Sequence, residues 1–170
     1  AGFTRPSYLP GETAQIHVAT DEPSLTLRTF HAGPEQVVTY ADNQLAGIEV
    51  DGDVPQTIDW AAWRSRSHTI SFRIPPLTSG LYFVQFGGPD GRIGYAPFVV
   101  RPTFLGTTNR TLVVLPTNTW QAYNFQDDDG NGFGDTWYAG PPNGRVDLGR
   151  TYTARGVPPR FYRYDLPFLH

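Results

Sequence analysis

The fold is decided by residues 81–100, which read LYFVQFGGPDGRIGYAPFVV. Two apolar and β-branched runs, residues 81–86 and 93–100, flank a turn made of Gly, Pro and Asp. Glycine adopts positive φ without strain and proline presets its own φ, so the middle segment reverses the chain. The stretch therefore predicts two antiparallel strands joined by a hairpin connection.

Shorter strands are expected on the N-terminal side of this hairpin. Residues 14–20, 25–30 and 69–74 alternate apolar or small side chains with polar ones, which is the period of a half-buried strand. The pattern predicts an antiparallel sandwich over residues 7–101. Its predicted core consists of Ile16, Val18, Leu25, Leu27, Phe72, Ile74, Tyr82, Val84, Phe86, Phe98 and Val100.

Helix signals are almost absent from the sequence. Residues 60–64, with Asp59 as an N-cap, predict a helix of one or two turns. Many short strands with little helix favour a mainly β fold, and we expect an immunoglobulin-like antiparallel β-sandwich over residues 1–101. Tyr82 enters its strand after Gly80, where such a sandwich places a tyrosine corner; an ordinary core tyrosine is the alternative.

A second, incomplete unit with long loops is expected over residues 102–170. Residues 111–116, TLVVLP, predict a strand buried on both faces. An acidic loop and a connector rich in Pro and Gly follow, and the aromatic tail of residues 161–170 ends on an apolar stretch without a cap or turn signal. Because the chain contains no Met, Ala1 is not an encoded start. We therefore expect a piece of a longer protein, whose remainder is its partner.

The composition excludes several kinds of chemistry. The chain has 170 residues, all 13 basic residues are arginine and there is no cysteine. Schiff-base lysines, disulfides and thiolate metal sites are therefore excluded. The net charge of −3 gives no basic field for nucleic acid. No apolar run approaches the roughly 20 residues of a membrane span. We expect neither a nucleic-acid nor a membrane partner, and the composition is compatible with a homo-oligomer.

Residues 127–135, which read DDDGNGFGD, have the ligand spacing of a calcium-binding loop. In such loops alternate residues point oxygen atoms inward, and glycine at the sixth position permits the sharp reversal. Ca²⁺ takes roughly 6–8 hard oxygen ligands, which clustered carboxylates supply. The predicted ligands are Asp127, Asp129, Asn131, the carbonyl of Phe133 and Asp135.

The loop departs from the usual pattern at its twelfth position. A bidentate Glu is expected there, and Tyr138 stands in its place. The closing ligand would be water, another carbonyl or a remote acid such as Asp147. A solvated acidic turn without an ion is the alternative interpretation.

Residues 117–124, TNTWQAYN, follow the predicted buried strand and resemble the large subunit of N,N-dimethylformamidase-like proteins. Residues 6–12 resemble that family's opening turn, and residues 96–102 resemble the strand that leaves its small β-sandwich. Residues 161–169 are similar to the segment that enters a helix of its amidotransferase-like α/β domain. The resemblance covers most of the chain, and the TWQAYN stretch is its distinctive motif.

The resemblance implies a hydrolase that splits formamides, with iron held by two tyrosines and a glutamate. Tyr123, in the matched motif, is the candidate catalytic residue and iron ligand. The second tyrosine could be Tyr152, Tyr162 or Tyr164. No glutamate follows Glu49, so we expect the chain alone to be inactive and iron to require the complete parent. The acidic loop is expected to be an addition outside the amidase site.

A different class of protein is also compatible with the sequence. A self-contained calcium-binding β-sandwich would bind carbohydrate or protein through exposed aromatic side chains such as Trp120, Trp137 and Tyr138. This interpretation requires residues 102–170 to complete the sandwich and to leave an aromatic platform exposed.

Overall fold

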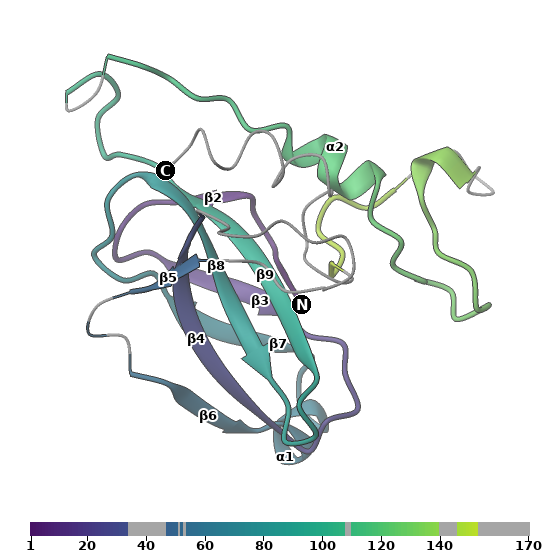
Figure 1. The fold of residues 1–170 in the computed structure, drawn as a ribbon. Coiled ribbons are helices and arrows are strands. Elements are labelled where there is room, and N and C mark those ends of the chain that lie inside the picture. Colours follow the sequence, from purple (N-terminus) through teal and green to yellow (C-terminus); the bar gives the residue numbers. More distant parts are fainter. Residues whose placement is uncertain (34–46, 51, 53, 108–109, 140–145, 153–170) are drawn as a thin grey trace.

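The structure, a computed structural model, describes residues 1–33, 47–50, 52, 54–107, 110–139 and 146–152. Two β-sheets pack against each other, and a short helix lies beside them (Figure 1). One sheet has the order β1-β3-β7; the other has the order β2-β9-β8-β4-β5, with β6 also paired to β4. The strands are β1 (Gly2–Phe3), β2 (Ser7–Tyr8), β3 (Thr13–His17), β4 (Ser24–Ala32), β5 (Gly47–Glu49), β6 (Gln56–Asp59), β7 (Thr69–Arg73), β8 (Gly80–Gly87) and β9 (Ile93–Val100).

The predicted β-sandwich is confirmed. β3 and β7 lie in one sheet while β4, β8 and β9 lie in the other, which is how an immunoglobulin fold divides its strands B and E from C, F and G. β8 and β9 form the predicted hairpin, with Gly87 opposite Ile93. Gly91 has a φ of 88° in the connection, a conformation that favours glycine.

One strand pair departs from the predicted antiparallel arrangement. β2 runs parallel to β9, with Ser7 opposite Val99, whereas β1 pairs with β3 in the other sheet. The first eight residues therefore contribute to both sheets. A strand of two residues is too short to show the alternating pattern of a strand. Sequence periodicity therefore did not predict that the N-terminal residues pair with both sheets.

All of the predicted core side chains are buried. They form one cluster between the sheets, to which Phe3, Tyr8 and Trp60 also belong. The short helix α1 (Trp60–Arg64) is present, and the side chain of Asp59 accepts a hydrogen bond from the amide of Ala62 at 3.0 Å. The alternating pattern thus identified the interior correctly, because each strand buries one face.

The tyrosine corner takes a different form from the predicted one. The hydroxyl of Tyr82 lies 3.2 Å from the side-chain hydroxyl of Thr78, not against a backbone atom. The hydroxyl of Tyr8 accepts a hydrogen bond from the backbone amide of Arg5 at 3.0 Å. A tyrosine tied to upstream backbone thus occurs in β2.

A second apolar cluster lies on the outer face of the β8–β9 pair. It contains Leu81, Phe83, Tyr95 and Trp120, and Trp120 comes from helix α2 (Thr117–Ala122). Figure 1 shows α2 beside β9. The helix therefore covers part of a sheet face that would otherwise meet solvent.

The strand expected at residues 111–116 is absent. These residues belong to no strand, and Leu112, Val113 and Val114 are exposed, Val114 by 80%. A strand requires a neighbour that exchanges backbone hydrogen bonds with it, and the described residues after Val100 contain no other strand. The apolar run is therefore not part of either sheet. The tail of residues 161–170 lies outside the described residues.

None of the helices in the described ranges is long and apolar enough to span a lipid bilayer. Among the described residues after α2, one further helical element is present, the 3-10 helix η1 (Trp137–Ala139).

Candidate functional site

The TWQAYN motif forms the second half of helix α2 and its C-cap. Trp120 and Gln121 are buried, and Tyr123 is the exposed C-cap residue. Gln121 and Asn124 bind the neighbouring segment, because Gln121 Nε2 donates to the carbonyl of Arg150 at 3.0 Å and Asn124 Nδ2 donates to the carbonyl of Thr151 at 2.7 Å. The motif thus positions α2 through its amides and leaves the phenol of Tyr123 accessible.

The acidic loop begins at Asp127, whose carboxylate organises the turn. Oδ1 accepts the amide of Gly130 at 2.8 Å, and Oδ2 accepts the amide of Gly132 at 2.8 Å. Both glycines have positive φ, 73° and 87°, so a residue with a Cβ would be strained there. These hydrogen bonds hold the pKa of Asp127 below its ordinary value, and the carboxylate stays ionised.

The arms of the loop meet in a narrow neck. The amide of Asp135 donates to the carbonyl of Gln126 at 2.9 Å. A Cβ on Gly134 would lie 2.6 Å from the carbonyl oxygen of Phe125, so only glycine fits this approach. The neck returns Asp135 to the carboxylates at the start of the loop.

Three of the predicted ligands come together. Carboxylate oxygens of Asp127, Asp129 and Asp135 all lie within 4.8 Å of one another. Asn131 is differently engaged, since its side-chain oxygen accepts the amide of Phe133 at 2.8 Å. Asp147, the remote acid, is not in the group; its carboxylate accepts the amide of Gly149 at 2.8 Å.

Asp128 points away from this group and toward Arg150. Arg150 Nη1 lies 2.9 Å from Asp128 Oδ2, and the arginine side chain is only 4% exposed. The same guanidinium binds backbone carbonyls of α2 and of the loop. Arg150 was not predicted from the sequence, because no local pattern distinguishes a buried arginine from an exposed one.

Tyr138 lies against Tyr123. Their ring centroids are 4.4 Å apart and the rings are nearly parallel, with an interplanar angle of 30°. Interaction with the Tyr123 side chain, together with burial, raises the pKa of Tyr138 above its ordinary value. The residue at the twelfth loop position therefore pairs with the motif tyrosine.

Tyr152 occupies a different environment. It packs at the margin of the cluster that contains Trp120, and burial raises the pKa of its phenol to about 12. Tyr162 and Tyr164, which the sequence also offers as a second tyrosine, lie outside the described residues.

The described glutamates do not complete an iron site at Tyr123. Glu12, Glu22 and Glu49 form ion pairs with Arg5, Arg92 and Arg28 of the sandwich. The tyrosine brought to Tyr123 is Tyr138, whose ring stacks on it. Within the described part of the chain the residues thus do not match the two-tyrosine, one-glutamate set.

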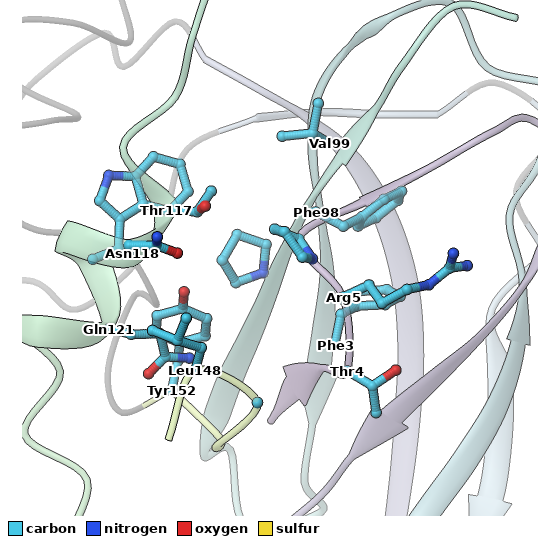
Figure 2. A pocket seen from close by; sticks show the side chains of 14 residues that line it. Phe3, Thr4, Arg5, Phe98, Val99, Thr117, Asn118, Gln121, Leu148 and Tyr152 are labelled. Atoms are coloured by element: carbon cyan, nitrogen blue, oxygen red, sulfur yellow. The ribbon is translucent and has the colours of Figure 1, made fainter. Parts of the chain in front are cut away.

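A cavity of about 190 Å³ lies between the sandwich and α2. Pro6, Pro97 and Phe98 line it from the sandwich, and Thr117 and Asn118 line it from α2. Arg5 also lies at its edge, but Figure 2 shows its guanidinium directed away from α2, where it binds Glu12 at 3.1 Å. The polar side chains that α2 contributes to the cavity are uncharged.

These features define a β-sandwich protein that carries a tyrosine-bearing helix and an acidic loop on one side. A family model described as N,N-dimethylformamidase beta subunit-like, C-terminal, matches residues 28–169, so the chain belongs to this family. The dimethylformamidase resemblance of the sequence is thereby confirmed at the level of the family. The description names a beta subunit; assignment to a large subunit stays a prediction. No curated protein matches the chain in sequence.

Proposed function

We propose that the chain is a non-catalytic part of an N,N-dimethylformamidase-like hydrolase that acts on amide C–N bonds. In this proposal Tyr123 belongs to the catalytic region of the parent, and residues 127–135 bind calcium. The family match supports the chemistry of the parent. The absence of any glutamate after Glu49 supports an inactive isolated chain, because the implied ligand set needs a carboxylate from elsewhere.

The distribution of exposed apolar side chains carries this proposal. In the described part of the sandwich the large exposed ones are Ile48, Val54, Trp63 and Ile93. After it they are Phe104, Leu105, Leu112, Val113, Val114, Tyr123, Phe125, Phe133, Trp137, Tyr138 and Leu148. Soluble proteins rarely expose apolar surface so densely unless it is an interface. The described residues between 104 and 148 therefore have the character of one side of a larger unit, which the remainder of the parent would cover.

Calcium binding is supported by the converging carboxylates. Asp127, Asp129 and Asp135 place like charges within 4.8 Å, an arrangement that a cation stabilises. Such a set of carboxylate and carbonyl oxygens suits Ca²⁺, which tolerates irregular coordination, better than Mg²⁺, which demands near-ideal octahedral geometry.

The activity assay compares the isolated chain with its parent. We expect no release of dimethylamine from dimethylformamide by the chain, with or without added iron. In the parent, Tyr123→Phe should abolish release, whereas Trp63→Phe, at an exposed position of helix α1, is the matched aromatic control that should not. Release by the isolated chain above a boiled-protein blank would contradict the proposal.

The stand-alone binding module remains the second candidate, because Trp137, Phe133 and Tyr138 are exposed around the loop. Its requirement for a completed sandwich is not met in the described ranges, where no residue after Val100 adds a strand. Saturable binding of an oligosaccharide that Trp137→Ala removes would favour this candidate.

A further inference from the structure

The guanidinium of Arg150 joins two segments that are separated in sequence. Nη2 donates to the carbonyls of Gln121 and Asn124, both at 2.8 Å, at the C-terminal turn of α2. Nη1 donates to Asp128 Oδ2 at 2.9 Å and to the carbonyl of Asp135 in the loop. One side chain thus bonds simultaneously to the end of the helix and to both arms of the loop.

These hydrogen bonds lie at a buried side chain, so their loss would not be compensated by water. The Arg150 side chain is 4% exposed, and Asp128 is its carboxylate partner. Removing the guanidinium would leave carbonyl groups of the helix end without their donor in a site that water reaches poorly. Lysine would keep the charge but could not reproduce the planar fork that reaches both segments.

The tyrosine pair is attached to the same two segments. Tyr123 lies between Gln121 and Asn124, the residues whose carbonyls Arg150 binds on the helix side. Tyr138 follows Asp135, the residue whose carbonyl Arg150 binds on the loop side. Arg150 thus bonds to backbone close in sequence to each of the two rings, whose centroids lie 4.4 Å apart.

We propose that Arg150 is a positioning residue that sets the stacking of Tyr138 on Tyr123, and that an ion in the loop acts on this pair through Arg150. The second part rests on the calcium loop proposed above. Asp135 provides the connection, since its carboxylate belongs to the acidic group while its carbonyl is bound by Arg150. An ion that draws this carboxylate inward moves a residue that Arg150 couples to the end of α2.

The experiment uses ¹⁹F NMR of the chain labelled with 3-fluorotyrosine, first in EDTA. Tyr123→Phe and Tyr138→Phe assign the two resonances among the 9 tyrosines. In an otherwise wild-type chain, Tyr138→Phe should shift the Tyr123 resonance, because the ring that stacks on Tyr123 changes. In Arg150→Met this cross-effect should be lost, and in Arg150→Lys it should be reduced. Arg92→Met, an arginine change in the sandwich, is the matched control and should retain it.

Resonances of Tyr8 and Tyr82, both buried between the two sheets, report whether each variant is folded. If Arg150→Met loses their dispersion, Arg150→Lys decides the first part of the proposal. An undiminished cross-effect in a folded Arg150 variant overturns it.

The second arm adds Ca²⁺ and follows the backbone amide of Gly132 as a probe of the loop. In the wild type, Gly132 and both tyrosines should respond with the same midpoint; in Arg150→Met, Gly132 should respond without the tyrosines. A Gly132 response without a tyrosine response in the wild type overturns the coupling but leaves the calcium site intact. No Gly132 response removes the calcium site and the coupling together, and the EDTA arm still decides the role of Arg150.

Discussion

Arg92, in the turn of the β8–β9 hairpin, places its Nε 2.7 Å from a carboxylate oxygen of Glu22, which precedes β4. The same nitrogen lies 2.7 Å from Asp90, so one guanidinium stands between two carboxyl groups. Glu22 is only 4% exposed. Its burial, together with a hydrogen bond to Asp90, raises the pKa of Glu22.

The first prediction follows from the sign of this shift. The folded state holds the Glu22 proton more tightly than the unfolded chain does, so this group stabilises the fold below its ordinary pKa of 4.5. That contribution is lost as the pH rises through the raised pKa. The free energy of unfolding of the wild type should therefore fall relative to Glu22→Gln over this range, as urea titrations at several pH values would measure. Parallel pH profiles would contradict the prediction.

Glu12 supplies the matched control for this experiment. Hydrogen bonds from the amide of Leu9 and from Arg5 lower the pKa of Glu12, so its contribution is present above 4.5 and is lost as the pH falls through the lowered pKa. Glu12→Gln should change the pH profile with the opposite sign.

The second prediction concerns the contact between α2 and the sheet. Trp120 is 3% exposed and packs with Phe83 and Tyr95. Trp120→Ala should lower the free energy of unfolding by about 3–5 kcal/mol, the usual cost of truncating a buried aromatic side chain. Trp137→Ala is the control, because Trp137 is 52% exposed and should cost no more than about 0.5 kcal/mol. Equal losses in urea denaturation would show that α2 does not cover the sheet.

The third prediction tests the acidic loop. Millimolar Ca²⁺ should raise the melting temperature above that in EDTA or in millimolar Mg²⁺, and Asp129→Ala should abolish the increase. Stabilisation grows as RT ln(1 + [Ca²⁺]/Kd), about 2.7 kcal/mol at a hundredfold excess. Without a Glu at the twelfth position we expect a Kd on the order of 10⁻⁴–10⁻³ M. Asp147→Ala should keep the response, since Asp147 is not in the carboxylate group. Equal wild-type melting temperatures in all three solutions would leave a solvated turn.

The fourth prediction concerns the unpaired apolar run at residues 111–115. Val114→Arg should make the isolated chain more monodisperse in size-exclusion chromatography with light scattering, because it interrupts an exposed apolar segment. Val54→Arg is the control, as Val54 is exposed on the sandwich, away from this run. In the complete parent, Val114→Arg should instead destabilise the protein. A parent that tolerates the change without loss of stability would contradict burial of this run.

The sandwich was predictable because its signals are local. The alternation of apolar and polar residues in β3, β4, β7, β8 and β9 predicted the core. Asp59, as an N-cap residue, predicted helix α1. The strands of two residues at the N-terminus have too few positions for a period, so their division between the sheets was not predictable. Residues 111–116 were wrongly predicted as a strand. Their composition indicates that they can form a strand, but it does not show whether a partner strand is present.

The candidate site was predictable only in part. The spacing of Asp127, Asp129 and Asp135 led to three carboxylates that do converge. The contact of Tyr138 with Tyr123 and the burial of Arg150 both arise from tertiary packing across the loop. The groups that bind Arg150 are mostly backbone carbonyls, which every residue has. The sequence therefore does not indicate which of them will bind an arginine.

The parallel pairing of β2 with β9 has a consequence for how the sandwich assembles. Ser7 and Val99 stand at opposite ends of the sandwich sequence, so this contact closes a very long loop and contributes heavily to the contact order. Closing this loop costs conformational entropy, so the contact becomes favourable only once most of the chain between Ser7 and Val99 is ordered. We therefore expect the Val99–Val100 end of β9 to be a bare edge during folding, open to pairing with other chains until residues 7–8 arrive. A short N-terminal segment, which also places Tyr8 in the core, would thus decide the balance between folding and aggregation.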